Sequence, residues 1–314
     1  MAGSSKKAIY AALVGNSLIA VTKFSAAFYT GSAAMLSEGI HSLVDTGNQI
    51  LLLFGLRQSL KPASHEFPFG HGKEVYFWCF ILAMLIIALG GTASIYQGVM
   101  HLSSSEPITN IFLNYIVLGL ALVFEGGALY VALKEFNKSR GDQTILEAVS
   151  NGKDPTLFVV VFEDSAAALG LLIAMFGLVM YQITGNTVFD AIASISIGVV
   201  LILTAIWLAY ESKGLLIGES TTLTIRQLIK NVFLNDLRVA AVNEVASLHM
   251  GPDFVLVTAS VQFARVETAG EVESAVTELT RKVKQVDPRI KRVFVEAERT
   301  ADHYLPPSLR EEDQ

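Results

Sequence analysis

Residues 37–45 read Ser37-Glu38-Gly39-Ile40-His41-Ser42-Leu43-Val44-Asp45, inside a largely apolar run from 33 to 56. A run of about 20 such residues predicts a helix that spans a lipid bilayer. Because residues four positions apart share a helix face, His41 and Asp45 present an imidazole and a carboxylate to one point. Ionisable groups inside a membrane helix usually face the bundle interior, so the pair predicts half of a metal site. In the structural alternative, His41 hydrogen-bonds a neighbouring helix and Asp45 acts as a cap.

The composition is that of an integral membrane protein. Of the 314 residues, 52% are hydrophobic and only 17% are charged, and the mean hydropathy is +0.49, which is too apolar for an ordinary soluble protein. The net charge of -6, without a basic stripe, excludes a nucleic-acid partner. The single cysteine, Cys79, provides neither a disulfide framework nor a thiolate cluster. Residues 1–7 lack a signal-peptide cleavage site, so the first apolar run is expected to remain a helix.

Six apolar runs are long enough to cross a bilayer, at 8–29, 33–56, 74–100, 111–132, 156–181 and 188–210. The segments before 8, between 57 and 73, between 133 and 155, and after 210 contain Lys or Arg. The linkers 30–32, 101–110 and 182–187 contain none. Because cytoplasmic loops collect basic residues, this alternation predicts a six-helix transmembrane bundle with both termini cytoplasmic.

The fifth apolar run carries two adjacent acids, Glu163 and Asp164. At 1.5 Å of rise per residue, Asp45 and Asp164 both lie roughly 18 Å below the outer surface, and His41 roughly 12 Å below it. Adjacent helical residues point about 100° apart, so both acids cannot face one site equally well. We therefore predict that Asp164 joins His41 and Asp45, with Glu163 as an accessory ligand or a proton-carrying neighbour.

Further polar residues are weaker candidates. Asn16, Asn48 and Glu125 are candidates for orienting the ligands, and an interhelical hydrogen bond without a metal role is an equal alternative for each.

The linker between the second and third runs contains His65, Glu66 and His71, which are candidates for an entry or secondary metal site. Because a loop rich in proline and glycine needs no metal to hold its shape, a purely structural loop is the alternative.

After Lys213 the pattern becomes that of a soluble domain. Helical spacing covers 221–234 and 271–286, and strands are predicted at 239–249, 254–264 and 290–298. The order αββαβ predicts a small cytoplasmic ferredoxin-like domain. The predicted domains are thus 1–213, 214–300 and a disordered tail at 301–314. In the second domain, His249 with Asp253 or Glu296 is a possible metal site, and a plain dimer contact is the alternative.

The sequence resembles the cation diffusion facilitator family, and most of all its zinc transporter nine-like branch. The resemblance rests on the six runs, the C-terminal αββαβ pattern, and the motifs Gly31-Ser32-Ala33-Ala34-Met35-Leu36-Ser37-Glu38, His41-x-x-x-Asp45 and Phe69-Gly70-His71-Gly72-Lys73-Glu74. Members of this family typically have a second His-x-x-x-Asp or Asp-x-x-x-Asp in the fifth helix, which completes a tetrahedral site. Here Asp164 matches the aspartate, but Val160 stands at the histidine position.

The resemblance and the ligand chemistry together predict a secondary transporter that exports a divalent cation, most of all Zn²⁺, in exchange for protons. A Mn²⁺, Fe²⁺ or Co²⁺ exporter, and a metal-sensing or scaffold protein without transport, are the alternatives. No enzyme is predicted, because the motifs His-Glu-x-x-His and Gly-x-Ser-x-Gly are absent. The expected partners are the lipid bilayer and a second copy bound through the cytoplasmic domain. In a prokaryote the expected location is the plasma (inner) membrane.

Overall fold

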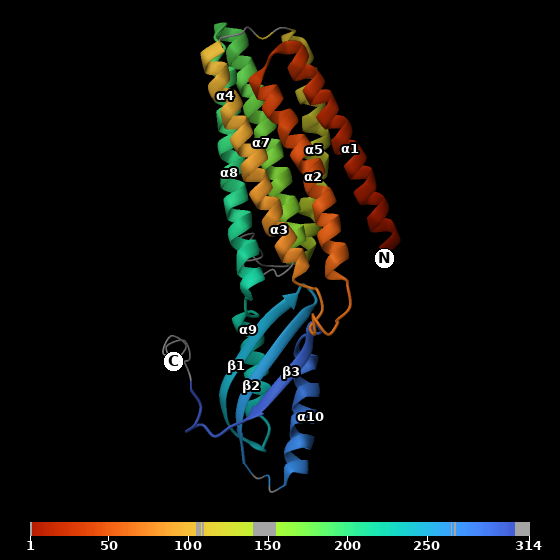
Figure 1. The fold of residues 1–314 in the computed structure, drawn as a ribbon, viewed down its shortest axis with the longest axis vertical. Helices are drawn as coiled ribbons and strands as arrows, with labels where there is room; N and C mark the ends of the chain where they lie inside the picture. The colour runs from red at the N-terminus through yellow and green to blue at the C-terminus, as the bar shows by residue number, and fades with distance from the viewer. Residues whose placement is uncertain are drawn as a thin grey trace. The chain divides into compact units, whose positions relative to one another are not determined.

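The computed structural model describes residues 2–104, 108, 110–140, 155–264, 266 and 268–304. Long helices fill the first two thirds of the chain (Figure 1). They are α1 (Ala2–Thr30), α2 (Ala33–Ser59), α3 (Glu74–Leu85), the π-helix η1 (Ile86–Gly91), α4 (Thr92–Ser104), α5 (Ile111–Arg140), α7 (Pro155–Thr184) and α8 (Val188–Ile217). Each of the six predicted apolar runs therefore lies within helical structure.

Four helical segments of the described chain are long and apolar enough to cross a membrane, at Glu74–Ser103, Ile111–Lys134, Val159–Thr184 and Val188–Ile217. The predicted count of six spans stays a prediction. Helix α2 falls short of such a composition because its buried face is polar, with Ser37, Glu38, His41, Ser42, Asp45 and Asn48. These residues lower its mean hydropathy while pointing into the bundle rather than toward lipid.

The third apolar run is a single helical column interrupted by the π-helix η1 between α3 and α4. At this point the column passes close to α8, because a Cβ on Gly91 would lie 3.0 Å from the carbonyl oxygen of Gly198. Small residues allow this close approach of two helix backbones. Thr92 Oγ1 donates a hydrogen bond to the carbonyl oxygen of Ile87, five residues earlier. The sequence predicted a plain helix here, since a π-helical turn has no hydropathy signal.

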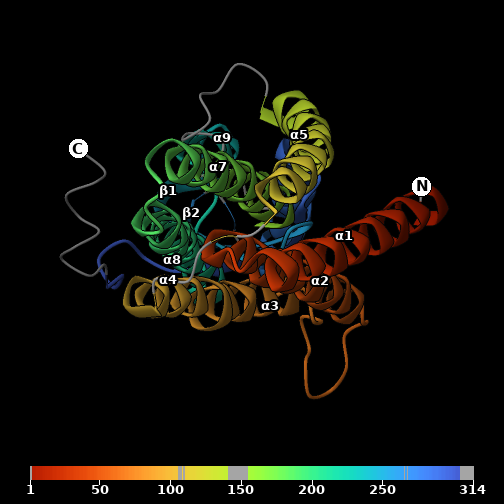
Figure 2. The same ribbon diagram turned by 90° about the horizontal axis from the view of Figure 1, so that it is seen from above.

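Helix α2 lies among α1, α3 and α7 when the bundle is seen from above (Figure 2). It contacts α3 where Gly55 meets the Trp78 side chain, and α8 where the hydroxyl groups of Ser37 and Ser194 are hydrogen-bonded. The helices α5 and α7 pack against each other, and α1 packs against α5. The polar face of α2 is consequently enclosed by its neighbours.

The C-terminal part has the order α9 (Leu223–Leu234), β1 (Val239–Gly251), β2 (Phe254–Phe263), α10 (Ala269–Val286) and β3 (Ile290–Ala297). This confirms the predicted αββαβ order. The sheet order is β1-β2-β3, with β1 antiparallel and β3 parallel to β2. Alternate residues of β2, from Val255 to Val261, point into a core against Ile229, Phe233 and Leu279 of the two helices.

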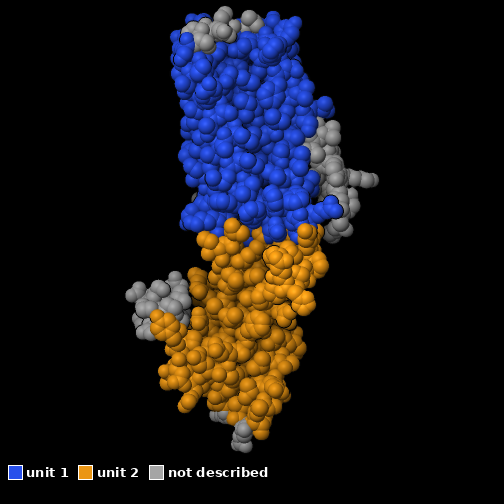
Figure 3. Space-filling view, in the orientation of Figure 1, with its two compact units in different colours: residues 1–58, 74–213 blue, residues 59–73, 214–314 orange. Residues whose placement is uncertain are grey.

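The chain divides into two compact units, one of residues 1–58 and 74–213 and the other of residues 59–73 and 214–314 (Figure 3). The loop that precedes α3 thus belongs to the second unit. A Cβ on Gly72 would lie 2.4 Å from the carbonyl oxygen of Met250, so this loop passes directly against the end of β1. The predicted limits of 1–213 and 214–300 stay predictions. The predicted disordered tail lies mostly outside the described residues.

Candidate metal site on helix α2

The candidate site is built on one buried face of α2. Glu38, His41, Asp45 and Asn48 follow one another at spacings of three or four residues, and each is at most 6% exposed. This spacing keeps the four side chains on one side of the helix. At 1.5 Å per residue, the row from residue 38 to residue 48 is about 15 Å long. The bundle interior therefore contains a continuous polar row, in which the predicted pair His41 and Asp45 is central.

The two predicted ligands on α2 are close together. His41 Nε2 lies 3.4 Å from Asp45 Oδ2. Neither ring nitrogen of His41 has a hydrogen-bond partner in the described part of the chain, and Asp45 Oδ1 also lacks one there. Buried polar atoms in proteins are nearly always hydrogen-bonded, so these atoms are free to bind an ion or a proton. An imidazole nitrogen and carboxylate oxygens are suitable ligands for Zn²⁺.

Helix α7 brings Glu163 into contact with Asn48, which lies three residues beyond Asp45 on α2. Asn48 Nδ2 donates a 2.5 Å hydrogen bond to Glu163 Oε1. Asp164 points about 100° away along the helix and is half-buried. Glu163 thus contacts the polar face of α2 through Asn48, while the roles of both acids in binding stay predictions.

Asn48 and Glu125, two of the three residues expected to orient the ligands, interact with acidic side chains of the cluster around Asp45. Asn48 contacts Glu163, as described above. Glu125 on α5 is buried and interacts electrostatically with Asp45, Glu163 and Asp164. Asn16 on α1 is half-buried. Glu125 therefore adds a further carboxyl group to the acidic cluster around Asp45.

Sequence reasoning missed an ion pair next to the site. Lys23 of α1 is fully buried, with Nζ 3.0 Å from Glu38 Oε2 and 2.8 Å from Ser42 Oγ. Ser42 directly follows His41 in the chain. The signal was present in the sequence, since Lys23 and Glu38 are ionisable residues inside apolar runs, and such residues are costly unless paired. Glu38 also precedes His41 by three residues, which places both on one helix face.

The secondary metal candidates belong to the second unit. His65 and Glu66 are exposed, whereas the His71 ring packs on Phe67 at 4.5 Å between ring centroids. His249 is buried on β1, and its Nδ1 lies 3.1 Å from the carbonyl oxygen of Glu219. Within the described ranges, no three His, Cys, Asp or Glu side chains are grouped closely enough to hold one metal ion. This also applies to His41, Asp45 and Glu163 in the conformation described.

The N-terminal end of α2 has a separate polar cluster. Asp190 of α8 accepts hydrogen bonds of 2.6 Å from Ser32 Oγ and from the backbone N–H of Ala33, and it lies 3.7 Å from His101 Nε2. A carboxylate at this position satisfies free amide groups and matches the helix dipole. Asp190 therefore anchors α2 to α8.

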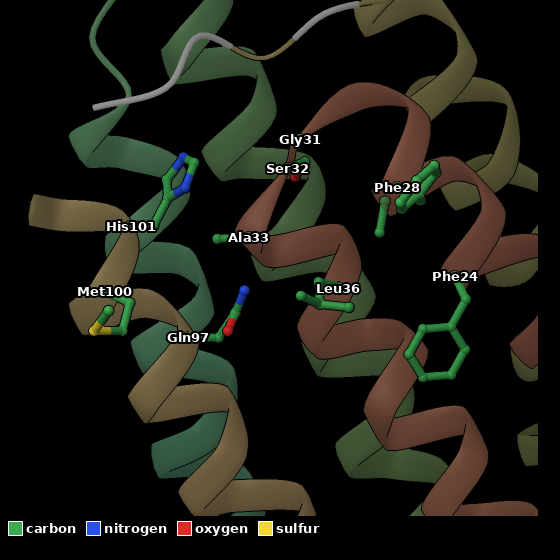
Figure 4. Close-up of a pocket in the computed structure, with 10 residues that line it drawn as sticks. Phe24, Phe28, Gly31, Ser32, Ala33, Leu36, Gln97, Met100 and His101 are labelled. Carbon is green, nitrogen blue, oxygen red and sulfur yellow. The ribbon is translucent and has the colours of Figure 1, made fainter. Parts of the chain in front are cut away.

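A pocket of about 500 Å³ opens beside this cluster, between α1, α2 and α4 (Figure 4). Phe24, Phe28, Leu36 and Met100 give it a mostly apolar lining, and His101 is on its rim. None of the predicted ligands lines this pocket, so it is distinct from the candidate site.

Comparison with known proteins shows the family to which the chain belongs. A family model described as the cation efflux transmembrane domain matches residues 9–217. The chain belongs to the cation efflux family. This membership confirms the resemblance to the cation diffusion facilitators, and it places the chain among multi-pass membrane transporters rather than enzymes.

Three relatives illustrate the range of similarity within the cation efflux family. The human mitochondrial proton-coupled zinc antiporter SLC30A9 is 34% identical over 270 residues, which are 85% of this chain and 48% of that protein. Metal tolerance protein C4 of Arabidopsis thaliana is 33% identical over 82% of this chain and 57% of its own length. The cation-efflux pump FieF of Escherichia coli is 26% identical over 78% of this chain and 77% of its own. The chain thus spans about half the length of the first two relatives.

Proposed function

We propose that this chain is a secondary active transporter that exports a divalent cation, most of all Zn²⁺, from the cytoplasm in exchange for protons. The observation that carries the proposal is the pair of His41 and Asp45. Their donor atoms are 3.4 Å apart, deeply buried, and partly without hydrogen-bond partners in the described part of the chain. The name of the human relative, a proton-coupled zinc antiporter, supports the same cargo and the same exchange.

Proton coupling follows from the chemistry of the proposed ligands. A metal ion binds a neutral imidazole and ionised carboxylates, so protons and metal compete for the same atoms. Buried carboxyl groups such as those of Asp45 and Glu163 can each carry a proton when no cation is bound. In the proposed cycle, a cation displaces such a proton from one side of the membrane. Protons then displace the cation on the other side.

Either acid of α7 fits as the third ligand. Glu163 contacts Asn48, which lies three residues beyond Asp45 on the same helix face, and a rotation of α7 by about 100° would exchange its position with that of Asp164. We propose that both acids serve the site, with His41 and Asp45 as the constant ligands. Because Val160 supplies no nitrogen ligand, the site is rich in oxygen donors, which favours Mn²⁺ or Fe²⁺ as the alternative cargo.

The test is metal flux into liposomes that contain the purified chain, driven by a pH gradient and followed with an enclosed metal indicator. Zn²⁺, Mn²⁺, Fe²⁺ and Co²⁺ are compared in the same preparation. We expect flux in the wild type and background flux in His41→Ala and Asp45→Asn. Asp190→Asn is the matched control, since it neutralises a buried carboxylate outside the proposed site and should retain flux per folded molecule.

The outcomes separate the alternatives. Undiminished flux in both His41→Ala and Asp45→Asn would refute the site. Tight metal binding without any flux would instead support a metal-sensing or scaffold protein. Preference for Mn²⁺ or Fe²⁺ over Zn²⁺ would retain the fold and the site but change the cargo.

We also propose a homodimer that pairs through the C-terminal domain. The sheet face turned away from the two helices carries Leu256, Thr258 and Phe294, and Phe294 is 48% exposed. The same face carries Arg292 and Glu296, and an exposed aromatic side chain with polar neighbours is suited to contact with a second copy of the chain. Phe294→Glu should lower the dimer fraction measured by light scattering. An unchanged mass would exclude this face.

A further inference from the structure

The Lys23–Glu38 ion pair has no part in the proposed binding of the cation, yet it lies beside the site. The ammonium group of Lys23 bridges Glu38 Oε2 and Ser42 Oγ at 3.0 and 2.8 Å. Both charged side chains are completely buried. Because taking two charges out of water costs several kcal/mol per ion, a buried pair is weak evidence for stability alone. The buried positive charge of Lys23 is therefore a candidate for a functional role.

The surroundings of Lys23 are strongly acidic. Glu38, Asp45, Glu125 and Glu163 are all buried in the same region of the bundle. The charge of Lys23 acts electrostatically on Asp45 and Glu125, and it also acts on His41. Glu38 has a second oxygen, Oε1, which has no hydrogen-bond partner in the described part of the chain and faces Gly170 of α7. The pair thus joins three helices around the proposed site.

A transporter must release its cargo as well as bind it. Carboxylates in a medium of low dielectric constant attract a divalent cation far more strongly than they do in water. A fixed positive charge at short range opposes this attraction. Such a charge lowers the affinity of the site without removing a ligand.

We propose that Lys23 is a built-in counter-cation of the metal site, which weakens cation binding enough to permit release, and that Glu38 holds it in place. Lys23 is a positioning residue here, not a ligand. This inference rests on the proposed function, because it needs a cation bound at His41 and Asp45. It further implies that the charge of residue 23 sets the affinity for cargo.

The experiment measures Zn²⁺ affinity of the purified full-length chain by competition with a fluorescent chelator. In Lys23→Gln, which keeps a hydrogen-bond donor but loses the charge, Zn²⁺ should bind about tenfold more tightly or better, equivalent to about 1.4 kcal/mol or more. In Lys23→Arg the affinity should stay within about threefold of wild type, because the charge is kept. The double variant Lys23→Gln with Glu38→Gln, which changes no net charge, should also return to that range.

The sign of the shift separates this role from a merely structural one. If the pair only packs α1 against α2, its loss should lower thermal stability and leave Zn²⁺ affinity equal or weaker. Asn114→Ala is the matched control, since it removes a different buried contact of α1, the 2.9 Å hydrogen bond with Thr30. That variant should melt earlier without tighter binding. Lys23→Met provides a second test with the same expected sign if Lys23→Gln does not fold.

Equal or weaker Zn²⁺ binding in the folded Lys23 variants would overturn the inference. This failure is distinguishable from failure of the proposed function. If wild type binds Zn²⁺ and Asp45→Asn does not, the site stands and only the role of Lys23 falls. If Asp45→Asn binds as wild type does, both proposals fail.

Discussion

Replacing Gly170 by alanine tests how tightly α7 fits against the Lys23–Glu38 pair. A Cβ on Gly170 would lie 2.5 Å from Glu38 Oε1 and 3.6 Å from its Cδ. Real Cβ atoms essentially never approach a heavy atom so closely, so the carboxylate must move. Glu38 has little room to do so, because it is fully buried and held by Lys23 at 3.0 Å.

The expected magnitude follows from opposing effects. Alanine in place of glycine inside a helix gains about 1 kcal/mol. Overpacking of a filled interior costs about 1–3 kcal/mol, and weakening a hydrogen bond to a charged group costs about 1.5–3 kcal/mol. The clash therefore outweighs the gain in helix propensity, and we expect Gly170→Ala to destabilise the protein by about 2 kcal/mol or more.

The assay is thermal unfolding of the purified chain in detergent, compared with Gly119→Ala. Gly119 on α5 has no atom within 4 Å of an added Cβ, so that control should be as stable as wild type or slightly more stable. Adding Glu38→Asp, which shortens the side chain by one methylene, should recover part of the loss in Gly170→Ala. Equal stability of Gly170→Ala and Gly119→Ala would refute this account of the α2–α7 contact.

Three further outcomes are expected. Asp190→Asn should cost about 1–2 kcal/mol in thermal unfolding, because the amide groups at the start of α2 lose a charged acceptor; an unchanged melting temperature would contradict this. Hydrogen bonds from Arg238 lower the pKa of Asp236. This pair should therefore stabilise the C-terminal domain above about pH 4, and the stabilisation should be lost as the pH falls further. Hydrogen exchange of the β1 amides should show that loss in wild type and not in Asp236→Asn. Gly72→Ala, whose Cβ would lie 2.4 Å from the carbonyl oxygen of Met250, should speed proteolysis of the loop before α3, and unchanged cleavage would argue against their contact.

Much of the fold could be predicted because its signals are local. Apolar runs of about 20 residues mark the helices, and the alternation from Val255 to Val261 marks a strand buried on one face. The same applies to His41 and Asp45, whose spacing of four residues fixes their proximity once a helix is assumed. Here the structure adds the 3.4 Å distance between their donor atoms.

The remaining features depend on how helices rotate and meet, which hydropathy does not determine. Glu163 and Asp164 are predicted at nearly equal depth, and only the packing of α7 brings Glu163 to Asn48. The Lys23–Glu38 contact likewise joins residues 15 positions apart on separate helices. Its two members were visible as charges in apolar runs, but their pairing was not.

In helix α2, the polar residues that form the candidate site also make the helix less apolar than a typical membrane-spanning helix. Its buried polar residues lower its hydropathy, and each would be costly against lipid. The structure meets this cost by pairing them with neighbours, as Glu38 with Lys23 of α1 and Asn48 with Glu163 of α7. The polar face of the helix is therefore suited only to an interior position in the bundle. Any motion that opens the proposed site must exchange one set of these partners for another, and a bound cation or proton is the natural substitute at His41 and Asp45.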